Sequence, residues 1–107
     1  MPVPHRLLPD RLRSVLPLLQ AQHHLSEPMV FARFGVPDGA WQFFVAEGEP
    51  AGADYLFFGL LMASEDEADW NWVELPLSQL IMVPDVMLDD EFTPATFPDA
   101  VPFPYVD

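Results

Sequence analysis

Four short hydrophobic segments, separated by turn-forming residues, run through the middle of this sequence. They span residues 29–34, 40–47, 54–63 and 70–75. The connection at 36–39 contains the proline, aspartate and glycine that are typical of a tight turn. Segments of this length, rich in aromatic and branched residues and bounded by such turns, favour β-strands. The pattern therefore predicts an antiparallel meander of about four strands.

The third segment is apolar on both of its faces. Alternation along a strand places its side chains in two sets, namely Tyr55, Phe57 and Leu61 on one face and Leu56, Phe58, Leu60 and Met62 on the other. A strand of this kind is expected to be covered on both sides. An N-terminal helix is expected to cover one face. The proline-rich end of the chain, a short helical stretch at 77–82, or another molecule is expected to cover the other.

The helix is predicted near residues 9–22, where leucines and a valine recur at helical spacing after Asp10, a plausible N-cap. Pro17 interrupts it, so a kink or an early end is expected there. Residues 48–52 and the acidic residues 65–69 are predicted to be loops. Beyond residue 84, prolines at four positions exclude helix and predict extended or turn-forming chain, namely Pro94, Pro98, Pro102 and Pro104.

The fold class predicted from these elements is α+β. One domain is expected over residues 1–107, with a core at 6–82 that combines the meander with the packed N-terminal helix. Residues 83–107 are expected to form a proline- and phenylalanine-rich tail that wraps on the domain. Half of the residues are hydrophobic and 13% are aromatic, which is too much apolar surface for a disordered acidic chain.

Several targeting and redox classes are disfavoured by composition. The longest apolar run, residues 55–63, is far shorter than the roughly 20 residues needed to span a bilayer. Prolines at positions 4 and 9 interrupt any continuous signal-peptide core. Cysteine is absent, which removes disulfides and thiolate chemistry and suits a reducing compartment. These features predict a cytoplasmic protein.

The charge of the chain is strongly asymmetric. Its formal net charge is −13, it contains no lysine, and its four arginines all lie at or before Arg33. From Phe34 onward every charged residue is a carboxylate. Solubility is satisfied by a net charge of about 2–8 in magnitude, so this excess suggests a further role.

The densest acidic segment places four carboxylates within residues 65–69. In an extended chain this amounts to about one charge per 4 Å, close to the ~3.4 Å phosphate spacing along one nucleic-acid strand. One interpretation is that the segment imitates a polyanion. The alternative is an ordinary solvated loop between two strands, whose acids keep the neighbouring strands soluble.

Residues near this segment are the candidate partner-binding site. Trp70, Trp72 and Glu74 are expected on one face of the fourth strand, and tryptophans within an acidic rim suit a protein–protein hot spot, although packing in the core is the commoner role of tryptophan. A second acidic group follows at 85–91. The predicted partner-binding set is Glu65, Asp66, Glu67, Asp69, Trp70, Trp72, Glu74, Asp85, Asp89, Asp90 and Glu91.

Catalytic and metal chemistries have weak support. His23 and His24 are adjacent and would point about 100° apart on a helix, so they do not converge on one metal. The acidic segments lack the glycine and spacing of a calcium loop, and no nucleophile or phosphate-loop motif is present. Neither a metal nor a cofactor is predicted. A hydrolase based on two carboxylates is the enzyme alternative, with candidates Glu47, Glu49, Asp54 and Glu74.

Several segments of the chain resemble the domain of unknown function 2958 family, whose members are small proteins common on bacterial mobile elements. The similarity extends over residues 6–82 and is carried by Phe34–Asp38, Trp41–Gly48, Asp54–Leu60, Trp72–Leu75, Leu77–Leu80 and the opening Leu7–Leu19. The resemblance implies a compact α+β fold and a mobile-element setting, and it brings no catalytic residues. The acidic segment, the tail and the absence of lysine depart from the family pattern.

The predicted function is a non-enzymatic acidic binding protein. The first hypothesis is an inhibitor that mimics nucleic acid and binds a basic defence or DNA-handling protein, of the anti-restriction or anti-CRISPR type. Direct nucleic-acid binding is disfavoured because the surface would repel phosphate. The alternative is an accessory interaction module without mimicry, for which a homodimer is conceivable.

Overall fold

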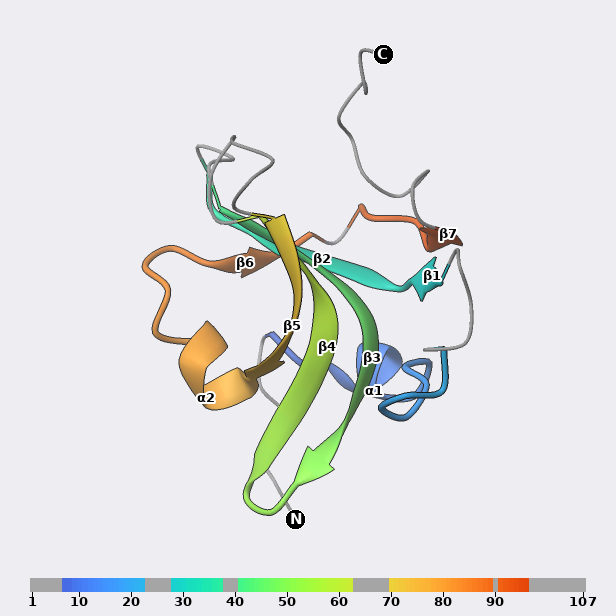
Figure 1. Cartoon of the computed structure of the whole chain (residues 1–107). Coiled ribbons are helices and arrows are strands. Elements are labelled where there is room, and N and C mark those ends of the chain that lie inside the picture. Colours follow the sequence, from blue (N-terminus) through green and yellow to red (C-terminus); the bar gives the residue numbers. More distant parts are fainter. Residues whose placement is uncertain (1–6, 23–27, 38–40, 63–69, 90, 97–107) are drawn as a thin grey trace.

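The computed structural model describes residues 7–22, 28–37, 41–62, 70–89 and 91–96. Its main element is a twisted five-stranded antiparallel sheet with the strand order β5-β4-β3-β2-β6 (Figure 1). The strands of this sheet are β2 (Ala32–Gly35), β3 (Gln42–Ala51), β4 (Asp54–Met62), β5 (Trp70–Pro76) and β6 (Met87–Leu88). A separate two-stranded sheet pairs β1 (Met29–Val30) with β7 (Ala95–Thr96).

The predicted α+β class is wrong, because the domain is mostly β. Strands account for 50% of the described residues and helices for only 11%. The N-terminal helix expected at 9–22 is reduced to α1 (Asp10–Arg13), and α2 (Leu77–Leu80) is equally short. No helix within the described ranges is long and apolar enough to cross a membrane.

Pro17 accounts for much of the missing helix. A proline at this position lacks an N–H donor, and its ring would clash with the carbonyl four residues earlier in a continuous helix. Gln20 then adopts a positive φ of 71°, which a helix does not contain. The chain instead runs beside the second half of β3, where the backbone N–H of Gly48 donates to the Pro17 carbonyl at 2.9 Å.

The four predicted strands are confirmed as a meander of β2, β3, β4 and β5, although their bounds differ. The first segment is divided at Phe31 into β1 and β2. Residues 48–51, predicted as a loop, extend β3, and the turn to β4 lies at Gly52 and Ala53 instead. Gly52 has a φ of +63°, the left-handed conformation that glycine adopts without steric cost. The sequence also did not predict β6, which lengthens the sheet beyond β2.

The larger core cluster lies on one face of the sheet. Leu7, Leu8, Leu12 and Leu16 from the N-terminal segment are buried there against residues such as Phe57 of β4. The Phe34 and Phe57 rings meet edge to face, with centroids 5.5 Å apart. The N-terminal segment therefore covers this face as expected, with a single helical turn in place of a long helix.

The opposite face has a smaller core cluster, formed by Val30, Phe44, Leu60 and Met62. Phe92 and Ala95 pack on this cluster from the C-terminal segment, and the Phe44 and Phe92 ring centroids lie 6.3 Å apart. As expected, the described part of the segment after residue 84 is extended or turning chain that lies against the domain. The rest of the predicted tail, 97–107, lies outside the described residues.

Candidate functional site

Trp70, Trp72 and Glu74 lie on the same face of β5, as the alternation of a strand predicts. Their partners on β4 are Met62, Leu60 and Phe58 respectively. Val73 and Leu75, at the alternate positions of the strand, contribute to the larger core cluster on the other face. The three side chains therefore share the face that carries the smaller core cluster.

These three side chains differ in burial. Trp70 is half-buried and packs on the smaller core cluster. Trp72 is 37% exposed, and its ring stacks on the half-buried ring of Phe58 with 5.6 Å between centroids and 20° between planes. Glu74 is exposed, and its carboxylate makes no ion pair or hydrogen bond with other described residues. The site thus combines an accessible aromatic stack with a carboxylate that can accept donors from a partner.

In the sequence, the densest acidic segment lies between the end of β4 and the start of β5. Its four carboxylates, Glu65, Asp66, Glu67 and Asp69, lie outside the described residues. β5 itself forms one edge of the five-stranded sheet. The sequence therefore attaches four carboxylates within a few residues of the exposed aromatic stack.

The described members of the second predicted acidic group flank β6, which forms the opposite edge of the sheet. Asp85 and Glu91 are exposed, Asp89 is half-buried, and Asp90 lies outside the described residues. Four interstrand spacings of about 4.8 Å separate the two edges, which is roughly 19 Å along the sheet. Among the described residues, Glu74 therefore lies on one edge strand and Asp89 beside the other.

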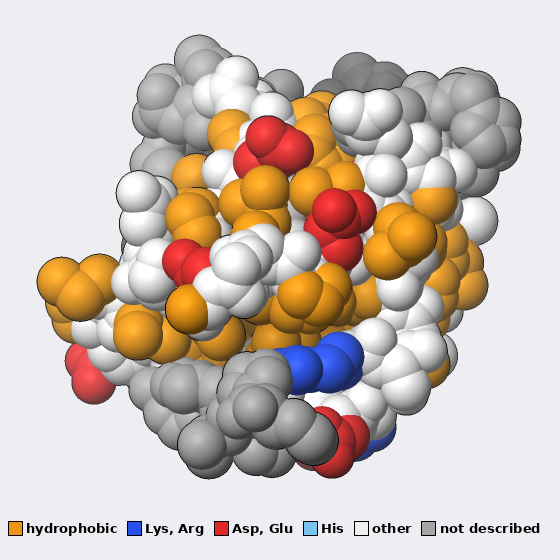
Figure 2. Space-filling model, turned by 90° about the horizontal axis from the view of Figure 1, so that it is seen from below, with side chains coloured by type: hydrophobic (Ala, Val, Ile, Leu, Met, Phe, Trp, Pro, Cys, Tyr) orange, Lys and Arg blue, Asp and Glu red, His pale blue; other side chains and the backbone are white. Residues whose placement is uncertain are grey.

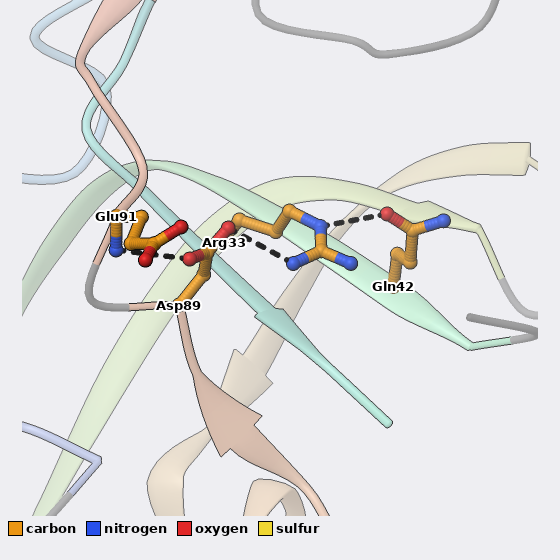
Figure 3. Close-up of polar contacts among 4 residues, drawn as sticks. All are labelled: Arg33, Gln42, Asp89 and Glu91. Carbon is orange, nitrogen blue, oxygen red and sulfur yellow. Dashed lines mark hydrogen bonds and ion pairs between the residues drawn. The ribbon is translucent and has the colours of Figure 1, made fainter. Parts of the chain in front are cut away.

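An ion pair between Arg33 and Asp89 holds the second edge together (Figure 3). The Arg33 Nη1 donates to Asp89 Oδ2 at 3.1 Å, and the Arg33 Nε donates to Gln42 Oε1 at 2.8 Å. The Asp89 Oδ1 accepts a 3.0 Å hydrogen bond from the backbone N–H of Glu91. This cluster was not predicted from the sequence, although Arg33 is the last cation before a stretch whose charged residues are all acidic.

Other carboxylates serve inside the domain. Glu47 is fully buried and accepts hydrogen bonds from the backbone N–H groups of Gln20 at 2.6 Å and Gln22 at 2.7 Å. Glu49 accepts one from the backbone N–H of Leu19 at 3.0 Å. These two side chains fix the N-terminal segment beside β3, in a stretch where β2 no longer pairs with that strand.

Asp54 has a comparable role at α2. Its carboxylate accepts hydrogen bonds from the Ser78 hydroxyl at 2.5 Å, from the Ser78 backbone N–H at 3.1 Å and from the Tyr55 backbone N–H at 2.8 Å. The Ser78 hydroxyl, followed by the Tyr55 N–H, lowers the pKa of this carboxyl below its usual 3.8. Asp54 therefore connects the start of β4 to α2.

Figure 2 shows the domain from below, relative to the view of Figure 1, and the acidic side chains on this surface are separate from one another. Hydrophobic side chains occupy much of this surface, and the carboxylates form isolated groups among them. The described carboxylates visible in this view do not form a continuous strip. Any continuous acidic surface must therefore involve other faces or the segments outside the described residues.

Comparison of the chain with protein-family models, curated proteins and solved structures gives no match. The resemblance to the domain of unknown function 2958 family accordingly stays a prediction. The chemistry of the surface itself therefore carries the functional interpretation.

The geometry gives little support to the carboxylate-pair enzyme. Glu47 and Glu74 lie on either side of Phe58, one on each strand next to β4, about 10 Å apart by strand spacing. The carboxylate of Glu47 is already engaged by backbone donors. A shallow hollow of about 330 Å³ beside Arg33 contains Asp89, and one of about 380 Å³ beside α2 contains Asp54; neither has a second carboxylate among its described lining residues.

Metal binding gains no support from the described residues either. They contain no group of three or more acidic or histidine side chains placed to hold an ion. The His23–His24 pair lies outside the described residues. The described part of the site presents an aromatic surface and exposed carboxylates.

Proposed function

We propose that this protein is a non-enzymatic binding protein that docks on a basic nucleic-acid-binding protein and blocks its phosphate-binding surface. Restriction and CRISPR effectors are proteins of this kind, and the cytoplasm is the compartment in which they would be met. The observation that carries the proposal is uncompensated charge. Every charged residue beyond Arg33 is a carboxylate, and Arg33 itself is paired with Asp89.

Electrostatic attraction would supply the first step of binding. A net charge of −13 creates a negative potential around a domain of 107 residues, and such fields accelerate encounter with a positive surface. Exposed carboxylates at both sheet edges, among them Glu74, Asp85 and Glu91, add to this field. The acidic segment 65–69 supplies its highest linear charge density.

Contact specificity would come from the aromatic stack on β4 and β5. Charge alone attracts many basic proteins, whereas a buried aromatic anchor discriminates among them. Trp72 and Phe58 offer such an anchor on the two strands that the acidic segment connects in the sequence. The half-buried Phe58 and the sheet beneath it keep the anchor rigid, which lowers the entropic cost of binding.

Competition with DNA tests this proposal. The protein is immobilised, exposed to a bacterial extract at low salt, and then washed with an excess of a duplex oligonucleotide. The proposal expects basic nucleic-acid-binding proteins to be retained and then released by the duplex. Retention of nothing, or retention of proteins that the duplex does not release, would contradict it. A variant with Glu65, Asp66, Glu67 and Asp69 changed to the corresponding amides serves as the matched control and is expected to retain less.

An accessory module that self-associates is the second candidate. It is favoured by hydrophobic side chains exposed around the α2–β6 connection, where Met82 is 77% exposed and Met87 is 58% exposed. A stable dimer in sedimentation equilibrium, together with no effect of neutralising the acidic segment, would favour this function over the first. A monomer whose retention of partners depends on that segment would favour the inhibitor.

A further inference from the structure

Phe58, Trp72 and Glu74 form a compact surface group across β4 and β5. Phe58 lies directly opposite Glu74 in the antiparallel register, and Trp72 precedes Glu74 by two residues on the same face. Directly opposite residues in such a pair have Cβ atoms about 4.5–5.5 Å apart. The carboxylate and the stacked rings of Phe58 and Trp72 therefore lie within reach of one ligand side chain.

Buried residues lie next to this group on both neighbouring strand positions. Leu60, the cross-strand partner of Trp72, is buried in the smaller core cluster. On the β3 side, Phe58 is opposite Glu47, whose carboxylate binds the backbone of Gln20 and Gln22. Of the two acids that flank Phe58, only Glu74 is exposed to solvent.

This combination matches the chemistry of an arginine side chain. A guanidinium group is planar, stacks on an aromatic ring, and donates two parallel hydrogen bonds to a carboxylate. A lysine ammonium group is a compact, strongly hydrated charge that gains less from the same surface. The overall negative charge of the protein favours a cationic ligand over an anionic one at this position.

We propose that Phe58, Trp72 and Glu74 are an arginine-binding site, through which the protein selects partners that present arginine. This inference rests on the proposed function, because a basic partner surface is what would bring arginine to β5. It goes further by assigning specificity to one group of side chains. The other carboxylates then contribute attraction that does not distinguish arginine from lysine.

Two capped peptides of equal length and charge test the site, one of alternating glycine and arginine and the other of alternating glycine and lysine. Affinities for the intact protein are measured by isothermal titration calorimetry at low salt. The arginine peptide is expected to bind about three- to five-fold more tightly. Equal affinities for the two peptides would overturn the proposal.

Variants locate the preference. Trp72→Leu and Glu74→Gln are each expected to abolish the preference for arginine while leaving binding of the lysine peptide within about two-fold. Asp85→Asn removes the same charge as Glu74→Gln at a distant exposed position and is expected to weaken both peptides equally. Persistence of the preference in both Trp72→Leu and Glu74→Gln would contradict the assignment. Circular dichroism confirms that each variant is folded.

The outcomes separate this inference from the proposed function. If neither peptide binds the protein at low salt, both the arginine site and the electrostatic docking are contradicted. If the peptides bind equally and the duplex still releases partners from the immobilised protein, only the arginine site is contradicted.

Discussion

Glu47 on β3 is fully buried, and its carboxylate accepts a 2.7 Å hydrogen bond from the backbone N–H of Gln22. The side-chain amide of Gln22 in turn donates to the backbone carbonyls of Met29 and Ala46, at 2.9 Å each. These bonds hold a non-helical segment beside β3 where β2 does not pair with it. They explain how the domain dispenses with a long N-terminal helix and still covers its sheet.

Replacing Glu47 should show how much this contact stabilises the domain. Glu47→Gln exchanges one acceptor oxygen for an amide NH₂ that faces backbone donors, so the free energy of unfolding should fall by about 1.5–3 kcal/mol. Urea denaturation measures the change. Glu49→Gln, which affects one half-buried bond, should cost less than about 1.5 kcal/mol. Equal losses in the two variants would contradict the role assigned to Glu47.

Gly59 is expected to be intolerant of any side chain. A Cβ atom at this position would lie 2.0 Å from the carbonyl oxygen of Phe44 on the neighbouring strand. Gly59→Ala must therefore separate β3 from β4, and a loss of at least about 3 kcal/mol is expected. Gly52→Ala is the control, because its Cβ meets nothing within 4 Å and only the positive φ is unfavourable, at about 1–2 kcal/mol. Thermal denaturation that ranks Gly52→Ala as the more damaging change would contradict the close approach of the strands.

Asp54 should give a pH-dependent contribution to stability. Hydrogen bonds from Ser78 and Tyr55 lower the pKa of Asp54 below 3.8 in the folded state, so folding favours its ionised form. The stabilisation is complete well above pH 3.8 and is lost as the pH falls through the lowered pKa. Asp54→Asn should therefore lower the melting temperature at pH 7, with a difference from wild type that shrinks toward pH 3.8 and below. A difference that grows on acidification would contradict this assignment.

The Arg33–Asp89 pair should contribute modestly to holding β6 on the sheet. Both side chains are partly exposed, so a double-mutant cycle with alanine at each position should give a coupling energy of about 0.5–1 kcal/mol. Unfolding in urea at low and high salt provides the measurement. The coupling should decrease with salt. Strictly additive effects of the two substitutions would show that the pair does not stabilise the domain.

The strand pattern could be predicted because it depends on local alternation and on turn residues. The face shared by Trp70, Trp72 and Glu74 followed from the same alternation and is confirmed by their register with β4. An early end of the helix at 9–22 was anticipated from Pro17, but α1 already ends at Arg13. Leucine spacing did not reveal that the rest of the segment pairs with the part of β3 that β2 leaves unpaired.

Contacts between residues far apart in the sequence explain why parts of the site could not be predicted from the sequence. The internal roles of Glu47 and Asp54 depend on bonds to residues more than twenty positions away, which no local pattern encodes. The pairing of Asp89 with Arg33, 56 positions apart, and the placement of Glu74 and Asp89 at opposite edges of the sheet depend on strand order in the same way. Composition indicated a binding role but not which carboxylates are exposed.

If the proposed function holds, this protein competes with nucleic acid for a basic surface. The most direct test uses a basic protein that the duplex released from the immobilised protein. That basic protein is bound to a fluorescent duplex, and the acidic protein is then titrated in while fluorescence anisotropy is recorded. We expect the duplex to be released, and the apparent affinity of the acidic protein to fall at least about ten-fold as salt rises from about 50 to about 200 mM. A duplex that stays bound at saturating acidic protein, or an affinity unaffected by salt, would contradict the account.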